Sequence, residues 1–179
     1  MRPLVYVILF VAAIVPISFI LVQENVIQTR HSRTFVTSSS AFENNGMIPS
    51  QYTCDGDGLS PPLAIAGVPQ TAKSLALTVV DADAPEGPFT HWIMWNISTN
   101  DTVFSAGDDV AFPQGITSAG THGYNAPCPP TGTHRYFFTI YALDTILNLD
   151  QNATRSDLEQ VMNGHIIDKT ELIGRYSRI

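Results

Sequence analysis

An uncharged segment of nineteen residues, from position 4 to position 22, limits what this chain can fold into more than any other feature of the sequence. A helix rises about 1.5 Å per residue, so this segment would cross the roughly 30 Å hydrocarbon core of a bilayer. A buried core helix is the weaker interpretation, because the segment is apolar on every side and the polar stretch after it lacks hydrophobic periodicity. We therefore expect residues 1–22 to be a membrane anchor or a signal segment.

Retention as a transmembrane helix is favoured over cleavage. Signal peptides usually have an apolar region of about 7–15 residues and end at a small-residue site, and residues 22–25 offer no such site. Arg2 precedes the segment, whereas Arg30 and Arg33 follow Val22 by eight and eleven residues. Positive charge thus lies closer to the start of the segment than to its end, which favours a cytoplasmic N-terminus. We therefore predict a membrane-anchored protein whose folded part is extracytoplasmic, or a secreted protein if the segment is cleaved.

The charge balance narrows the function of the remaining chain. The sequence has 179 residues, enough for one domain of ordinary size, with nine basic and sixteen acidic side chains and a net charge of −7. So acidic a chain is a poor match for the phosphate backbone of nucleic acid, and we expect no nucleic-acid partner. We interpret residues 23–37 as a polar tether and residues 38–179 as the folded domain.

The folded domain has the pattern of a mainly β protein. Three runs rich in β-branched and aromatic residues predict three central strands, at residues 74–80, 92–97 and 136–143. The loops between them are dense in glycine and proline, which is typical of turns. Residues 171–178 predict a last strand.

One helix is predicted near the C-terminus. Thr154 can act as its N-cap, with Asp157 in the first turn, Leu158 and Met162 on the apolar face and Gly164 just beyond the end.

Polar side chains follow or open the three predicted strands. Asp81 and Asp83 come directly after the first run, His91 precedes the second, and His134 and Tyr136 open the third. If the strands are neighbours, these side chains meet at one edge of the sheet, where loops hold functional groups against a rigid scaffold. Each also has a structural interpretation, as a turn carboxylate, a satisfied strand-end histidine or part of an ion pair.

Several short motifs agree in order and spacing with one known family. They are Tyr-Thr-Cys-Asp-Gly at 52–56, Ser-Pro-Pro-Leu at 60–63, Asp-Ala-Asp-Ala-Pro at 81–85, His-Trp at 91–92, Ala-Pro-Cys-Pro-Pro at 126–130 and Gly-Thr-His-Arg-Tyr at 132–136. Together they resemble the phosphatidylethanolamine-binding protein family, and most closely its bacterial and archaeal branch of Raf kinase inhibitor-like proteins. The resemblance covers about residues 38–179.

The resemblance implies a large antiparallel β-sheet packed with a smaller sheet and flanked by short helices, here preceded by one N-terminal transmembrane helix. It also implies a small anion pocket for phosphate-bearing ligands such as phospholipid head groups, and it implies neither a cofactor nor a metal. Carried over position by position, the ligand-binding residues are Asp81, Ala84, Pro85, His91, Ala126, Cys128, Pro130, His134 and Tyr136. Asp83 and Arg135 match the motifs as supports of the loop.

The chemistry of these residues agrees with the resemblance only in part. A phosphate group needs several donors, and a tyrosine hydroxyl, imidazole N–H groups and backbone N–H groups at turns supply them. Asp81 is the difficult member, because a carboxylate repels phosphate. We therefore expect Asp81 either to share a proton with the ligand or to hold His91 in its charged form.

Cys54 and Cys128 both lie in motifs near the expected pocket. Outside the cytoplasm they can form a disulfide, and inside it two packed thiols are the alternative. The sequence leaves both open.

Two other functions compete with simple ligand binding. Catalysis is not expected, because the aspartate and histidines lack a nucleophile in a recognisable motif, and their spacing matches no usual metal site. Relatives are described as inhibitors of kinases or serine proteases, so a protein partner is the second possibility. For an outward-facing domain that partner would be an extracytoplasmic serine protease.

Overall fold

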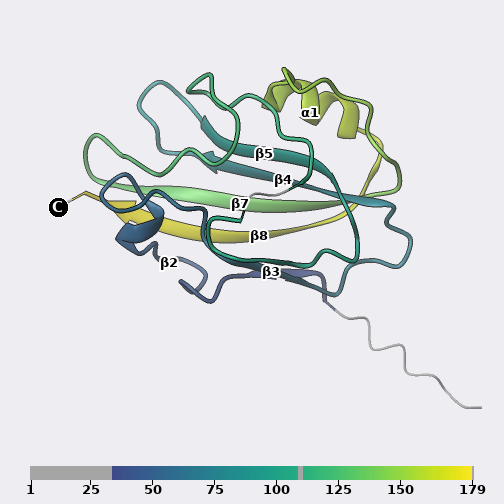
Figure 1. Cartoon of the computed structure of the whole chain (residues 1–179), viewed down its shortest axis with the longest axis horizontal. Coiled ribbons are helices and arrows are strands. Elements are labelled where there is room, and N and C mark those ends of the chain that lie inside the picture. Colours follow the sequence, from purple (N-terminus) through teal and green to yellow (C-terminus); the bar gives the residue numbers. More distant parts are fainter. Residues whose placement is uncertain (1–33, 109–110, 179) are drawn as a thin grey trace, which may run out of the picture. The chain divides into compact units, whose positions relative to one another are not determined.

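Four long strands lie side by side across the domain in the computed structural model, which describes residues 34–108 and 111–178 (Figure 1). The large sheet has the order β2-β8-β7-β4-β5, formed by β2 (Gly46–Met47), β4 (Ser74–Asp81), β5 (Phe89–Ile97), β7 (Thr133–Leu143) and β8 (Ile166–Ser177). The small sheet has the order β1-β3-β6, formed by β1 (Val36–Ser38), β3 (Leu63–Ala66) and β6 (Val103–Phe104). The helices of the described part are α1 (Arg155–Met162) and the 3-10 helix η1 (Ser50–Tyr52).

This architecture confirms the predicted mainly β fold with two sheets and few helices. The three apolar runs are β4, β5 and β7, and β4 lies between the other two. β5 is nevertheless at the edge of the sheet rather than central. The pairing of β2 with β8 is parallel, so the large sheet is not purely antiparallel as expected.

Alternation of side chains along the strands divides the core into two clusters. On β4, Leu77 and Val79 belong to a cluster that also contains Leu63 of the small sheet. Ala76 points to the opposite face and packs in a second cluster with Leu158 of α1. The small sheet therefore covers one face of the large sheet, and α1 covers part of the other.

The first strand begins inside the segment expected to be a tether. Val36 starts β1, and the flanking side chains of Phe35 and Thr37 are buried. The expected boundary at residue 38 is therefore too late, because these two side chains alternate into the core although the local sequence is mostly polar. The membrane segment at residues 4–22 lies outside the described residues. Within the described ranges, no helix is long and apolar enough to cross a membrane.

The predicted helix is confirmed with its cap. Thr154 accepts a hydrogen bond from the Asp157 backbone N–H, and the Asp157 side chain accepts one from the Thr154 backbone, which makes a capping box. Leu158 and Met162 are the buried residues of α1. The last strand is also confirmed, but it begins at Ile166, five residues earlier than predicted.

Shortening Leu158 tests how much the α1 cluster contributes to stability. Its side chain is completely buried, so Leu158→Ala should lower the free energy of unfolding by about 2–5 kcal/mol. Gln160→Ala, at an exposed position of the same helix, is the control and should change it by less than about 0.5 kcal/mol. Urea unfolding of the full-length protein measures both. An equal effect of the two variants would contradict the packing described here.

Candidate ligand-binding site

The pairing of β4 with β7 determines which polar side chains lie together at one end of the large sheet. The two strands pair without a shift, so that Asp81, the last residue of β4, lies opposite Tyr136. His134 lies two residues before Tyr136 and on the same face of β7. All three side chains are buried, with exposed fractions of 4% for Asp81, 6% for His134 and 0% for Tyr136. Three of the four side chains expected at this edge are thus together.

His91 reaches the same place through an irregularity in β5. Successive residues of β4 pair with Trp92 and then with Thr90, so β5 contains one extra residue, His91. Regular alternation would direct His91 and Trp92 to opposite faces of the sheet. The bulge instead lets the His91 ring meet the Tyr136 ring edge-on, with centroids 5.2 Å apart.

The Asp81 carboxylate accepts two hydrogen bonds within the protein. Its Oδ2 accepts from Nδ1 of His134 at 2.7 Å, and its Oδ1 accepts from the backbone N–H of Asp83 at 2.9 Å. The second contact is the local turn that such sequences often form. The first is a long-range contact across the paired strands. The structural and the functional interpretations of this motif therefore both apply.

The expectation that Asp81 holds His91 in its charged form is wrong. Nδ1 of His91 donates to the backbone carbonyl of Asn125 at 2.6 Å, and Asp81 bonds to His134 instead. Burial lowers the pKa of His91 below its usual 6.5, although the Asn125 carbonyl and the Asp81 charge act in the opposite direction. His91 is therefore neutral at pH 7. With its proton on Nδ1, its Nε2 atom is a hydrogen-bond acceptor.

The Tyr136 hydroxyl is buried and has no hydrogen-bond partner among the described residues. Burial raises the pKa of Tyr136, and the nearby Asp81 carboxylate raises it further. The hydroxyl therefore stays protonated, and the Asp81 carboxylate, although close enough to raise its pKa, does not meet it in full hydrogen-bond geometry. Buried polar side-chain atoms usually have partners, so this group is an exception that requires an explanation.

A cavity of about 380 Å³ opens beside these side chains. The residues that line it are Asp81, Ala84, Pro85, Glu86, Gly87, Phe89, His91, Asn125, Ala126, Cys128, Pro129, Pro130 and His134. Every residue expected to bind the ligand is in this lining except Tyr136, which is fully buried against His91. Sequence reasoning missed Glu86, Gly87, Phe89 and Asn125, whereas Pro129 lies in the 126–130 loop that the family motif places at the pocket. The missed residues adjoin expected residues in the same loops, and that adjacency was the available signal.

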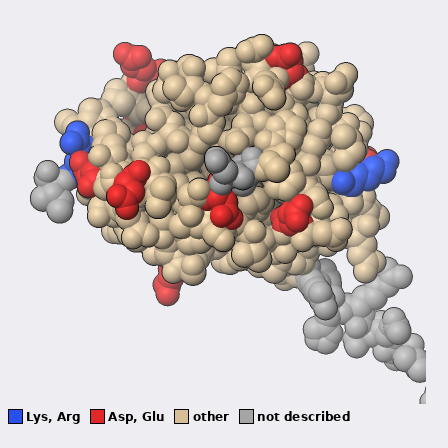
Figure 2. All heavy atoms as spheres, viewed as in Figure 1, with Lys and Arg blue, Asp and Glu red and all other residues tan. Residues whose placement is uncertain are grey.

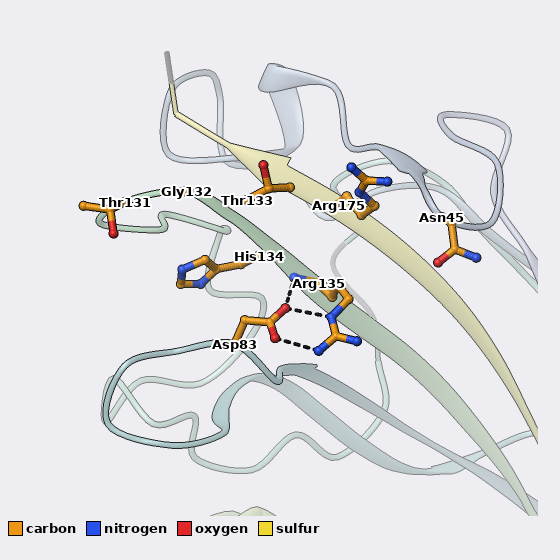
Figure 3. Close-up of a pocket in the computed structure, with 8 residues that line it drawn as sticks. All are labelled: Asn45, Asp83, Thr131, Gly132, Thr133, His134, Arg135 and Arg175. Carbon is orange, nitrogen blue, oxygen red and sulfur yellow. Dashed lines mark hydrogen bonds and ion pairs between the residues drawn. The ribbon is translucent and has the colours of Figure 1, made fainter.

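Asp83 and Arg135 lie away from this cavity and line a second, more open hollow (Figure 3). Asp83 accepts three hydrogen bonds from Arg135, one from the backbone N–H at 2.9 Å and two from the guanidinium at 2.7 and 2.8 Å. These bonds hold the pKa of Asp83 at about 2. The pair ties the loop after β4 to β7, which is the supporting role expected of it. Asp83 therefore does not join the carboxylate and imidazoles of the cavity.

Comparison with known proteins places this geometry in a family. The sequence model described as phosphatidylethanolamine-binding protein matches residues 38–177. The chain belongs to the phosphatidylethanolamine-binding protein family. Members of this family are ligand-binding modules.

Relatives of the family occur in archaea and bacteria. A UPF0098 protein of Methanothermobacter thermautotrophicus is 48% identical over 144 residues, which cover 77% of this chain and 95% of the relative. A UPF0098 protein of Chlamydia pneumoniae is 44% identical over 145 residues, which cover 78% of this chain and 97% of the relative.

Two solved structures share the fold. A putative phosphatidylethanolamine-binding protein homologue from Chlamydia trachomatis superposes with a TM-score of 0.80 at 40% identity, covering 82% of this chain and 99% of the other. YbcL of Escherichia coli, described as a new member of the mammalian family, superposes with a TM-score of 0.75 at 27% identity. The match covers 81% of this chain and 99% of YbcL.

In this member of the family, a disulfide between Cys54 and Cys128 joins two loops near the cavity, with Cα atoms 5.4 Å apart. The Cys54 backbone N–H also donates to the Pro127 carbonyl at 3.1 Å. Of the two alternatives that the sequence leaves open, the structure has the bridged one. The bridge holds the proline-rich loop that forms one wall of the cavity.

Replacing Cys54 and Cys128 together by serine should destabilise the protein. The bridge spans 74 residues of chain, and the chain-entropy model gives a loss of about 4 kcal/mol in the free energy of unfolding for such a loop. Urea unfolding of the full-length protein, kept in solution with a non-ionic detergent, measures the loss. Reductant should destabilise the original protein and leave the double variant unchanged. An original protein that is insensitive to reductant and has two free thiols by mass spectrometry would contradict the bridge.

The lowered pKa of His91 predicts a pH dependence of stability. Below about pH 6.5 the unfolded chain binds a proton at this position more readily than the folded chain does, so stability falls as the pH falls. His91→Asn removes this contribution. Between pH 7.5 and pH 5.5 the variant should therefore lose less stability than the original protein, as measured by urea unfolding at both pH values. A larger loss in the variant would show that the folded state favours the charged ring.

Proposed function

We propose that the cavity is a non-catalytic binding site for small phosphate-bearing ligands, such as the head groups of phospholipids. One observation carries the proposal: the imidazoles of His91 and His134 line a cavity whose walls are mostly apolar, and the ring of the fully buried Tyr136 meets that of His91 edge-on. Sites for small molecules commonly combine apolar walls with a few convergent polar groups, and a volume of about 380 Å³ lies in their usual range.

The hydrogen bonds around Asp81 explain how a phosphate group is accepted beside a carboxylate. Both carboxylate oxygens already accept hydrogen bonds, one of them from His134. In the complex, Nδ1 of His134 keeps its hydrogen bond to Asp81 while Nε2 of the same ring interacts with the ligand. The carboxylate thus acts on the phosphate through the imidazole ring.

His91 and Tyr136 complement His134 as partners of the ligand. The Tyr136 hydroxyl lies behind the lining without a fully formed hydrogen bond, and a phosphate oxygen that reaches it would be its acceptor. Nε2 of the neutral His91 is an acceptor, which suits a phosphate that keeps one proton. This combination favours a singly charged phosphate group over a fully ionised one.

In the described part of the chain the lining offers no hydroxyl, amine or free thiol as a nucleophile. Cys128 is held in the disulfide and has no thiol, and the other lining side chains include no serine, threonine or lysine. These features support binding rather than turnover.

We also propose that the domain works outside the cytoplasm and is attached to the membrane through residues 4–22. A disulfide persists in oxidising compartments, which supports this location. Figure 2 shows acidic side chains scattered over one face, with basic ones only at its two sides. An acidic surface is repelled by anionic lipid, so selective capture in the cavity fits better than broad adhesion to a membrane.

Removing the Tyr136 hydroxyl tests the proposal. Isothermal titration of the full-length protein in non-ionic detergent with phosphoethanolamine should show binding, and Tyr136→Phe should weaken it about tenfold through loss of one charge-assisted hydrogen bond. The same change should leave stability unchanged or raise it, because it removes an unpartnered buried hydroxyl.

Tyr141→Phe is the matched control, since this half-buried tyrosine of β7 packs against the α1 cluster instead of the cavity. It should bind phosphoethanolamine as the original protein does. Absence of binding to the original protein, or equal affinity of the Tyr136→Phe variant, would overturn the proposed function.

A further inference from the structure

Two arginines lie directly opposite each other on neighbouring strands of the large sheet. The register of β7 with β8 pairs Arg135 with Arg175. Like charges in directly opposite positions destabilise a sheet. The pairing is also unexpected in a chain with nine basic residues and a net charge of −7. The register therefore places two positively charged residues opposite each other at this point of the sheet.

The positive charge of the pair is neutralised only in part. Arg135 forms a bidentate ion pair with Asp83. Arg175 is exposed, and within residues 34–108 and 111–178 it takes part in no ion pair and no side-chain hydrogen bond. One guanidinium group, with five N–H donors in a planar fork, is thus left for another partner.

A hollow of about 600 Å³ lies in front of the two arginines (Figure 3). Its lining also includes Asp83, whose carboxylate is paired with Arg135, and Thr131, Thr133 and Asn45, none of which makes a side-chain hydrogen bond with another described residue. Two hydroxyls and an amide therefore add neutral donors around the guanidinium groups.

We propose that this hollow, which we call the arginine hollow, is a second anion site that takes a phosphate or sulfate group. The fork of Arg175 matches two oxygens of such a group, and the threonine hydroxyls can donate to the others. Arg135 adds positive charge from the opposite strand while Asp83 holds it in place. The bound anion would offset the charge of Arg175, while Asp83 already offsets that of Arg135.

The arginine hollow is distinct from the cavity of the proposed function. His134 is the one residue that lines both. Arg135 and His134 are consecutive in β7, so their side chains leave opposite faces of the strand. The two sites therefore hold separate ligands, and the second site does not depend on the first.

An NMR titration with inorganic phosphate, and separately with sulfate, tests the second site at constant ionic strength. The full-length protein in non-ionic detergent should show saturable shifts of the Arg175 Nε–H and Gly132 amide signals. Arg175→Gln should weaken this binding at least tenfold, and Arg175→Lys should weaken it also, because an ammonium group lacks the planar fork. The Tyr136→Phe variant should keep the site, so that failure of the cavity and failure of the arginine hollow are distinguishable.

Lys169→Gln is the matched control, since it removes the same charge from an exposed position of the same strand. It should leave the affinity unchanged. Shifts that never saturate, or equal weakening by Lys169→Gln and Arg175→Gln, would mean diffuse screening and would overturn the proposal. Dihexanoyl phosphatidic acid, a soluble lipid with a terminal phosphate, separates the sources: binding tighter than that of inorganic phosphate assigns a lipid head group, and equal or weaker binding assigns the free anion.

Discussion

The unshifted pairing of β4 with β7 is the interaction on which the candidate site depends. Eight successive residues of β4, ending at Asp81, pair with eight residues of β7 without a bulge. Because side chains alternate, a slip of one residue would turn the whole apolar set of β7 away from the core. The complete burial of Leu77 and Phe138 therefore holds Asp81 opposite Tyr136 by the same packing that holds the two sheets together.

The other neighbour of β4 is irregular, and this irregularity completes the site. β5 shifts register twice against β4, and one shift inserts His91. An extra residue is tolerated here because β5 lies at the edge of the sheet, where no further strand must follow its course. The regular pairing of β4 with β7 places Asp81, His134 and Tyr136 together, and the irregular β5 adds His91, the second imidazole.

Much of this arrangement can be predicted from the sequence, because the signals are local. Runs of β-branched and aromatic residues mark β4, β5 and β7, and a capping box at Thr154 marks the helix. The short strands β2 and β6, of two residues each, are too short to show a periodicity. The motif spacing also identifies most of the cavity lining. It cannot show that Asp81 bonds to His134, 53 residues away, rather than to the nearer His91, since that choice depends on a bulge. The opposition of the arginines likewise depends on the register of two strands.

Asp81 and Tyr136 are both buried polar residues beside the cavity, but they differ in how well their hydrogen bonds are satisfied within the protein. Asp81 has hydrogen bonds to both carboxylate oxygens, so its burial is compensated within the protein. The Tyr136 hydroxyl has none in full geometry, and a fully unpartnered buried hydroxyl costs up to about 1–3 kcal/mol of stability. Phenylalanine would fill the same space without that cost, so stability alone does not explain a hydroxyl at this position. A ligand acceptor that reached this hydroxyl from the cavity would find it already stripped of water, and it would gain the hydrogen bond without the cost of ordering the group. The destabilising feature of the free protein is thus the feature that would make its ligand bind tightly.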